Sequence, residues 1–228
     1  MAFAQGRPGG AMVLWDFDGT LASTSGDVWG SLAYAAAKRD RRFPLGFEDD
    51  DENLALPMSE IFASLLPAPD PADLAGFERD VRVHYRSIST HPRTELYPGI
   101  KSLLVELRAR GVANRIVTNK PQGALERLLS IKGWAPLFDG WVCADSGPDG
   151  TELTKEQMIR SVMERRGADP ARCVMIGDSW GDVAGARAAG IASIGVTYGD
   201  GNVERLLEEG PDRVAEESTG LRELLLGD

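Results

Sequence analysis

Met12–Thr20 reads MVLWDFDGT, an apolar run that passes directly into two aspartates around one phenylalanine. A short apolar run that ends at a turn-forming pair, here Asp18-Gly19, is typical of a buried β-strand. An extended chain points alternate side chains to opposite faces, so Asp16 and Asp18 should point the same way and Phe17 the other way. The stretch therefore predicts a strand that carries two carboxylates at its carboxyl end.

Similar apolar runs recur along the chain, with helix-like segments between them. The predicted strands after the first, which ends at Phe17, are Arg115–Thr118, Trp141–Ala144, Cys173–Gly177 and Ala192–Val196. The predicted helices are Gly99–Arg110, Gln122–Ile131, Thr154–Arg166 and Asp182–Ala189. Alternation of strands and helices with short connections favours a parallel sheet covered by helices on both faces. The predicted fold class is α/β.

The stretch between Ser23 and Arg93 breaks this alternation. Its predicted helices are Val28–Arg39, Ser59–Leu66 and Pro71–Ser87, and prolines separate them. A chain of 228 residues is long enough for a core domain that carries a smaller insertion. We therefore predict an α/β core formed by residues 1–22 and 94–228, with a small α-helical cap at residues 23–93 inserted after the first strand.

Composition narrows the class of protein. Hydrophobic residues make up 43% and charged residues 26%, values that are ordinary for a globular protein. The net charge of −10 gives no general attraction to nucleic acid or to an anionic membrane. The N-terminal stretch lacks the apolar centre of a signal peptide, and no apolar run approaches the ~20 residues of a membrane span. We expect a cytoplasmic protein, a monomer or a homodimer, with neither nucleic acid nor membrane as partner.

Two more aspartates follow another apolar run, VMIGD. Asp178 ends it, and Asp182 lies in the first turn of the next predicted helix, where alone it would cap backbone N–H groups. Ligands of open α/β sheets bind beyond the carboxyl ends of the strands, where these residues should gather. Asp16, Asp18 and Asp178 together would concentrate negative charge that requires a cation, and hard carboxylate oxygens favour Mg²⁺.

Polar residues suited to a phosphate group follow two other elements. Thr118 and Asn119 end a predicted strand, and Lys155 begins a predicted helix. A hydroxyl, backbone amides and an ammonium group can donate hydrogen bonds to phosphoryl oxygens as their negative charge increases during the reaction. Lys120 is a weaker candidate than Lys155 for the ammonium group of this site, and we interpret it as a loop residue after the strand.

With these motifs in order, the chain resembles the haloacid dehalogenase superfamily, and within it the phosphoglycolate phosphatase-like members with a helical cap. The resemblance extends from Met12 to Leu226. It is carried by DFDGT (Asp16–Thr20), YPG (Tyr97–Gly99), VTNK (Val117–Lys120), Lys155 and GDSWGDVAGARAAG (Gly177–Gly190). Ordered motifs of this kind are specific as a set, although each one alone is not. The resemblance implies a Rossmann-like core and a Mg²⁺-dependent phosphatase acting on a small phosphorylated metabolite.

The resemblance also implies a role for each matched residue. Asp16 would be the nucleophile that forms an aspartyl-phosphate, and Asp18 the general acid and base. Thr118 and Asn119 would bind the phosphoryl group, and Lys155 would offset negative charge. Mg²⁺ would be held by Asp16, the backbone carbonyl of Asp18 and Asp178, with Asp182 in support directly or through water.

Two positions depart from the family pattern. Ser23-Thr24 stands where the family often has Asp-Ser, and Lys155-Glu156 stands where it often has Lys-Pro. The second change leaves the lysine itself in place.

Other functions stay open to different degrees. A haloacid dehalogenase uses no metal and usually lacks the second aspartate, so Asp18 and Asp178 disfavour it. A sugar-phosphate mutase of the β-phosphoglucomutase type keeps all these residues, and only the cap would distinguish it. A noncatalytic phospho-ligand binding or interaction protein is expected where the nucleophile or the acid is missing, and both are present here. A phosphoglycolate-like compound, a sugar phosphate, a nucleoside monophosphate and a biosynthetic intermediate all remain candidate substrates.

Overall fold

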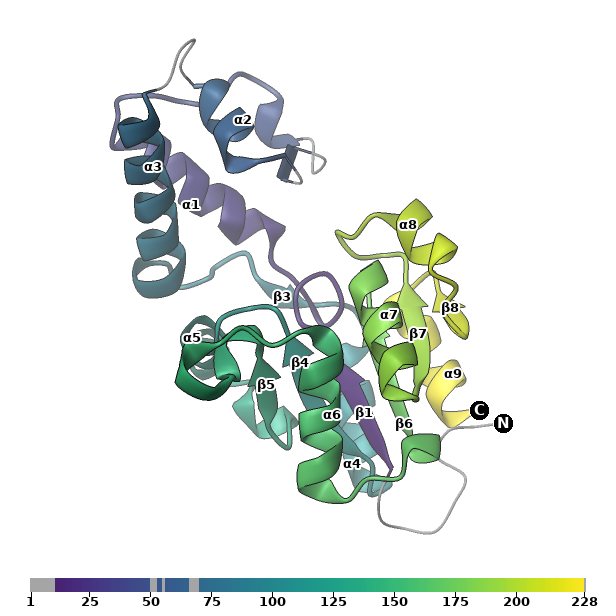
Figure 1. Ribbon diagram of the computed structural model, residues 1–228. Coiled ribbons are helices and arrows are strands. Elements are labelled where there is room, and N and C mark those ends of the chain that lie inside the picture. The colour runs from purple at the N-terminus through teal and green to yellow at the C-terminus, as the bar shows by residue number, and fades with distance from the viewer. Residues whose placement is uncertain (1–10, 50–52, 55, 66–69, 228) are drawn as a thin grey trace. The chain divides into compact units, whose positions relative to one another are not determined.

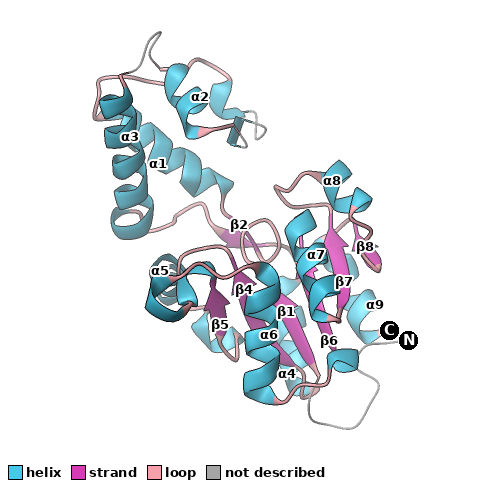
Figure 2. Cartoon of the chain, viewed as in Figure 1, coloured by secondary structure: helices cyan, strands magenta, loops and turns pink. Residues whose placement is uncertain are grey.

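Figures 1 and 2 present the computed structural model, which describes residues 11–49, 53–54, 56–65 and 70–227. These residues form two compact units. The first runs to Ser23 and continues from Glu95, and the second is Thr24–Thr94. The boundaries differ by one residue at each end from the predicted division between core and cap. The role of the second unit as a cap stays a prediction.

A six-stranded sheet forms the centre of the first unit. In spatial order its strands are β5 (Trp141–Cys143), β4 (Ala113–Thr118), β1 (Met12–Trp15), β6 (Cys173–Gly177), β7 (Ala192–Val196) and β8 (Arg213–Ala215). Every neighbouring pair is parallel. After β1 the chain builds outward through β4 and β5 and then crosses to β6, so the strand order reverses around β1. The predicted α/β fold is confirmed, and β1 lies at its topological switch point.

Helices cover both faces of this sheet, as Figure 2 shows. The helices of the first unit are α4 (Ile100–Ala109), α5 (Gln122–Lys132), α6 (Lys155–Arg166), α7 (Trp180–Ala189), α8 (Val203–Glu208) and α9 (Leu221–Leu226). A short antiparallel pair, β2 (Ala22–Ser23) with β3 (Glu95–Leu96), lies where the chain leaves this unit and returns to it. Among the helices that the structure describes, none combines the length and apolar character that a bilayer crossing would need.

The side chains of β1 alternate between two hydrophobic clusters. Val13 and Trp15 pack with residues of α4, α5 and α9, whereas Met12 and Leu14 pack with residues of α6 and α7. All four are almost completely buried, and full burial of each such side chain stabilises the fold by roughly 1.5–3 kcal/mol. This two-sided burial fixes the strand, and therefore also fixes the position of Asp16, which follows it directly.

The second unit is helical. Its helices are α1 (Ser25–Ala37), α2 (Met58–Ala63) and α3 (Pro71–Val83), and a π-helical turn, His84–Ile88, follows α3. Asp70 caps α3 by accepting a hydrogen bond from the Ala72 N–H at 2.8 Å. The Phe62 and Phe77 rings stack with centroids 4.8 Å apart in a separate hydrophobic cluster. Each predicted helix of this stretch has a counterpart, and the predicted end of one of them, Leu66, lies outside the described residues.

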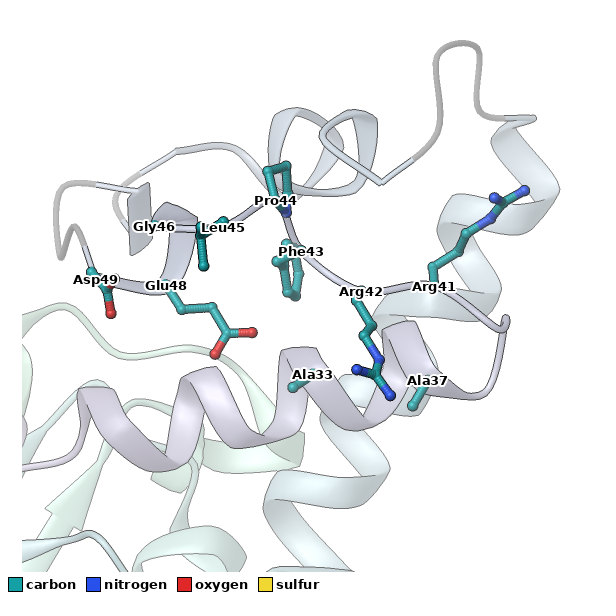
Figure 3. Close-up of a pocket in the computed structure, with 10 residues that line it drawn as sticks. All are labelled: Ala33, Ala37, Arg41, Arg42, Phe43, Pro44, Leu45, Gly46, Glu48 and Asp49. Atoms are coloured by element: carbon teal, nitrogen blue, oxygen red, sulfur yellow. The ribbon is translucent and has the colours of Figure 1, made fainter.

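A hollow of about 460 Å³ lies between α1 and the segment that follows it. Figure 3 shows Phe43, Leu45 and Glu48 above the side of α1 that carries Ala33 and Ala37. No aspartate or lysine that the sequence predicts for catalysis lines this hollow. We therefore assign it no part in the chemistry.

Candidate active site

Three strands deliver polar side chains to one edge of the sheet. Asp16 follows β1, Thr118 ends β4 and Asp178 follows β6. Parallel strands place their carboxyl ends at the same edge, and both β4 and β6 pair with β1. The Asp16 N–H donates to the Ile176 carbonyl at 2.8 Å, which continues the pairing one residue past β1. The sheet thus gathers at its switch point the residues that the sequence predicts for catalysis.

Asp16, Asp178 and Asp182 form an acidic cluster. One carboxylate oxygen from each lies within 4.8 Å of the others, a spacing that allows a single cation to bind all three. The Asp182 carboxylate also accepts hydrogen bonds from the Ser179 N–H at 3.1 Å and the Ser179 hydroxyl at 2.6 Å, and so caps α7. Asp182 therefore combines the capping role with a place in the acidic cluster.

Burial and mutual repulsion disfavour the charged forms of Asp16 and Asp178. Burial raises the pKa of Asp16 to about 6, with Asp182 and Asp18 adding to the rise and Lys155 opposing it. Burial, then the charges of Asp16 and Asp182, raise the pKa of Asp178 to about 7. A divalent cation among three hard oxygen donors would relieve both effects, so the residues present fit a metal such as Mg²⁺.

In the absence of divalent metal, we expect the free energy of unfolding to fall as pH rises from about 4 to about 7. The folded pKa values of Asp16 and Asp178, about 6 and about 7, exceed the ordinary 3.8, so the folded protein binds more protons in this window. The stabilisation that these protonated acids provide is fully present below their pKa in the unfolded chain. It is lost as the pH rises through their pKa values in the folded protein. Urea denaturation at several pH values, with EDTA or with Mg²⁺, measures the effect. An identical fall in both conditions would contradict a metal bound by these acids.

Lys155 neutralises part of the negative charge of this cluster. It is the first residue of α6, after Thr154, which caps the helix. Its ammonium lies 3.1 Å from Asp16 and 2.7 Å from Asp182, and it donates to the Val117 carbonyl at 3.1 Å. Burial lowers the pKa of Lys155, but the charges of Asp16 and Asp182 outweigh it and raise that pKa above its ordinary value. Lys155 is thus a buried, charged partner of the predicted nucleophile.

Lys120 makes a contact that the sequence interpretation did not anticipate. Its ammonium lies 2.7 Å and 2.9 Å from the two carboxylate oxygens of Asp18. The Lys120 side chain is 6% exposed and that of Asp18 is 39% exposed, so Asp18 lies on the open side of the pair. Each of the two lysines therefore serves a different aspartate, and they are not rivals for one role.

The predicted phosphate-binding residues lie at the end of β4. Thr118 is buried, and its hydroxyl oxygen accepts a hydrogen bond from the Lys120 N–H at 3.2 Å, which leaves its own proton available to a ligand. Asn119 is exposed. Thr20, which the sequence quoted only as part of a motif, lies 3.4 Å from Asp178 through its hydroxyl.

Glycines allow close packing around the acids. Gly19 has a φ of 72°, and a Cβ there would lie 2.1 Å from an Asp178 carboxylate oxygen. A Cβ at Gly177 would lie 2.2 Å from the Asp182 carboxyl group, and one at Gly199 would lie 2.1 Å from the Gly19 carbonyl oxygen. Side chains at these positions would displace the carboxylates. The loop that contains Gly199 thus lies against the site.

Residues 13–196 match the model of the haloacid dehalogenase-like hydrolase family, and this range contains the aspartates, both lysines and Thr118 described above. The chain belongs to this family. It is 30% identical to a phosphoglycolate phosphatase of Agrobacterium fabrum, with 94% of this chain and 92% of that one covered. It is also 29% identical to a 5'-nucleotidase of Pseudomonas aeruginosa, with 93% and 94% covered. The predicted family is confirmed.

Solved structures agree with this assignment at the level of the fold. A crystal structure from Clostridium difficile has a TM-score of 0.82 at 24% identity and covers 96% of this chain and 100% of that one. A predicted phosphatase from Clostridium acetobutylicum has a TM-score of 0.71 at 28% identity, with 94% and 97% covered. The haloacid dehalogenase-like fold therefore accounts for nearly the whole length of the chain.

Proposed function

We propose that this haloacid dehalogenase-like hydrolase is a Mg²⁺-dependent phosphatase that cleaves the phosphate monoester of a small metabolite through an aspartyl-phosphate on Asp16. The observation that carries the proposal is the setting of the Asp16 carboxylate. It lies at the switch point of the sheet, 3.1 Å from the Lys155 ammonium and within 4.8 Å of two further acids. A carboxylate held among charges of both signs suits attack on a phosphoryl group whose own charge must be offset.

In the first half of the reaction, an Asp16 oxygen attacks phosphorus and the bond from phosphorus to the ester oxygen breaks. Asp18, two residues further along, gives its proton to the departing oxygen. The Thr118 hydroxyl, whose oxygen already accepts the Lys120 N–H, donates its proton to a phosphoryl oxygen. Lys155 holds the Asp16 carboxylate in place during this step.

In the second half, Asp18 accepts a proton from water while the water oxygen attacks phosphorus. The bond between phosphorus and the Asp16 oxygen breaks, and phosphate leaves. The Lys120 ammonium contacts both Asp18 oxygens, so it can stabilise the carboxylate that remains once Asp18 has given its proton to the departing oxygen. The same residue thus serves as acid and then as base, as microscopic reversibility requires.

Asp16 and Asp178, with support from Asp182, would hold the metal. When bound, Mg²⁺ supplies positive charge that offsets the charge of the phosphoryl oxygens. Asp182 contributes in a second way, since it also holds the Lys155 ammonium at 2.7 Å.

The proposed substrate is phosphoglycolate-like or a sugar phosphate. Relatives from Agrobacterium fabrum and Vibrio vulnificus, each 30% identical to this chain, are named phosphoglycolate phosphatases. The relative named 5'-nucleotidase adds nucleoside monophosphates to the compounds worth testing. Phosphate release from a panel of these three classes, with Mg²⁺ and with EDTA, tests the proposal. Formation of an isomeric sugar phosphate without release of phosphate would assign the chain to the mutases instead.

Asp18→Asn should lower steady-state turnover by about 10²–10⁴-fold, the range expected for loss of general acid–base catalysis. The amide cannot donate to the leaving oxygen or accept the proton of water, so any aspartyl-phosphate that forms should persist. Rapid acid quenching after mixing with a ³²P-labelled substrate measures the trapped phosphoenzyme. An unchanged steady-state rate would remove Asp18 from its assigned role.

A further inference from the structure

Arg115 occupies a place in the sheet where an apolar residue is expected. It lies on β4, an interior strand between β5 and β1. Ala113 and Val117, two residues before and after it, pack in the hydrophobic cluster of α6 and α7. Because side chains alternate along a strand, Arg115 points to this same helix-covered face. A charged side chain on the covered face of an interior strand departs from the pattern, and such departures concentrate at functional sites.

The Arg115 guanidinium group has no counterion in the described part of the chain. Its Nε is buried and has no hydrogen-bond partner among the described residues. Asp139, the acid whose charge acts on Arg115, is already engaged: one oxygen lies 3.0 Å from Arg108, and the other accepts the Asn114 N–H at 2.9 Å. A buried N–H donor without an acceptor is unfavourable, and more so when the group is charged, which marks Arg115 as an unusual residue at this position.

Positive charge accumulates around this group. Burial, then the charge of Arg166, lower the pKa of Arg115, with Arg165 adding to the effect and Asp139 opposing it. Arg165 and Arg166 end α6 and are exposed. Arg115 and Arg166 line the same cavity in a protein whose net charge is −10. The repulsion between their charges would be relieved by an anion placed between them.

Arg115 and Arg166 border a cavity. It has a volume of about 310 Å³, and its lining includes Arg115, Arg166, Asp139 and Met12. That size is within the ordinary range for small-molecule sites. Gly140 fixes one wall: a Cβ there would lie 2.9 Å from an Arg115 Nη nitrogen, so the guanidinium group rests against the backbone.

The cavity and the catalytic groups lie at opposite ends of the strands. Met12 begins β1 and Ala113 begins β4, so the cavity opens at the amino edge of the parallel sheet, whereas Asp16 and Thr118 lie at the carboxyl edge. A ligand bound here does not belong to the catalytic site.

We propose that this cavity is a second binding site, which takes a small molecule bearing a phosphate or carboxylate group between Arg115 and Arg166. Guanidinium groups suit such oxyanions because their planar N–H donors match two oxygens at once. The site goes beyond the proposed phosphatase function and does not depend on it.

Titration with inorganic phosphate and, separately, with citrate in EDTA tests the proposal. The ¹H–¹⁵N resonance of the Arg115 Nε–H, identified by its absence in Arg115→Lys, reports directly on the buried group. We expect it to shift and saturate, and the preference between the two anions identifies the ligand class. Arg166→Gln, an exposed change that should not disturb folding, should weaken the affinity about tenfold or more, as expected for one charge-assisted contact.

Arg160→Gln is the matched control, because Arg160 is exposed on the same helix and pairs with Glu156 at 2.8 Å. It should leave anion affinity unchanged, and both glutamine variants should retain turnover of whatever substrate the panel reveals. A resonance that does not move with either anion, or an Arg166→Gln protein that binds them as the native protein does, would overturn the proposal. Neither result would bear on the catalytic assignment, since the readout is independent of activity.

Discussion

Asp16→Asn should leave a folded protein whose turnover is lower by more than about 10⁴-fold, as expected when a covalent nucleophile is removed. The amide is a poor nucleophile and loses a charged oxygen from the cluster formed with Asp178 and Asp182. Lys155 retains its contacts with Asp182 at 2.7 Å and the Val117 carbonyl at 3.1 Å, so its position should survive. Phosphate release from the best panel substrate at saturating Mg²⁺ measures the loss.

A stability measurement and a control variant distinguish this loss of catalysis from a loss of folding. Burial raises the pKa of Asp16 to about 6, so its ionised form is unfavourable in the metal-free folded protein. Asp16→Asn should therefore be within about 1 kcal/mol of the native stability in EDTA near neutral pH. Asp169→Asn is the control: Asp169 is an exposed N-cap that accepts the Ala171 N–H at 3.0 Å, and Asn caps equally well. Retained turnover in a folded Asp16→Asn protein would exclude an aspartyl-phosphate at this position.

Secondary structure was predictable where apolar runs are long and bounded by turn residues. The bounds of β6 and β7, Cys173–Gly177 and Ala192–Val196, agree with the prediction. The strand predicted to reach Phe17 ends at Trp15, although the Asp16 N–H still pairs with the Ile176 carbonyl and Phe17 packs in the hydrophobic core. β8, Arg213–Ala215, was missed: it is a three-residue edge strand held by backbone pairing with β7, and such a segment carries no apolar period.

The start of α7 was placed two residues late. The helix begins at Trp180, because Ser179 and Asp182 form a capping box across its first turn. That serine followed three residues later by an acid is a recognisable start signal, so the sequence held the information.

The aspartates of the site could be identified from the sequence because each lies near the end of a predicted strand or the start of a predicted helix. The contact between Lys120 and Asp18 was not, since 102 residues separate them and only the pairing of β4 with β1 brings their loops together. Arg115 is a further case. Its sequence neighbours are unremarkable in charge, and only the packing of α6 on β4 shows that its buried Nε lacks a partner.

Lys155→Met should be the most destabilising single change in the site, with a loss of about 3–5 kcal/mol, as expected when one partner of a buried ion pair is removed. The Lys155 ammonium is the nearest positive charge to both Asp16 and Asp182, at 3.1 Å and 2.7 Å. Methionine has a similar length and no charge, so it fills the space while two buried carboxylates lose their partner. Activity should be lost with it, and urea denaturation in EDTA measures the stability directly.

The pH dependence of that loss identifies its cause. In Lys155→Met the pKa of Asp16 should rise further above the value of about 6 that it has beside the lysine. Protonation then removes the unpaired charge, so the loss of stability should be smaller near pH 5 than near pH 7.5. The lysine's own contribution changes little in this range, because its raised pKa lies above the ordinary 10.5. A loss of equal size at both pH values would indicate damage to packing instead.

Substitutions of two other lysines serve as comparisons for Lys155→Met. Lys101→Met removes an exposed lysine from the first turns of α4 and should be nearly neutral. Lys120→Met removes the partner of Asp18, whose side chain is 39% exposed and can be solvated, so it should cost less stability than Lys155→Met. If the two buried lysines serve different aspartates, Asp16→Asn should reduce the cost of Lys155→Met and leave that of Lys120→Met unchanged. Coupling of Asp16 to both lysines alike would mean that the site acts as one undivided charge network, and the separate roles proposed for the two lysines would have to be abandoned.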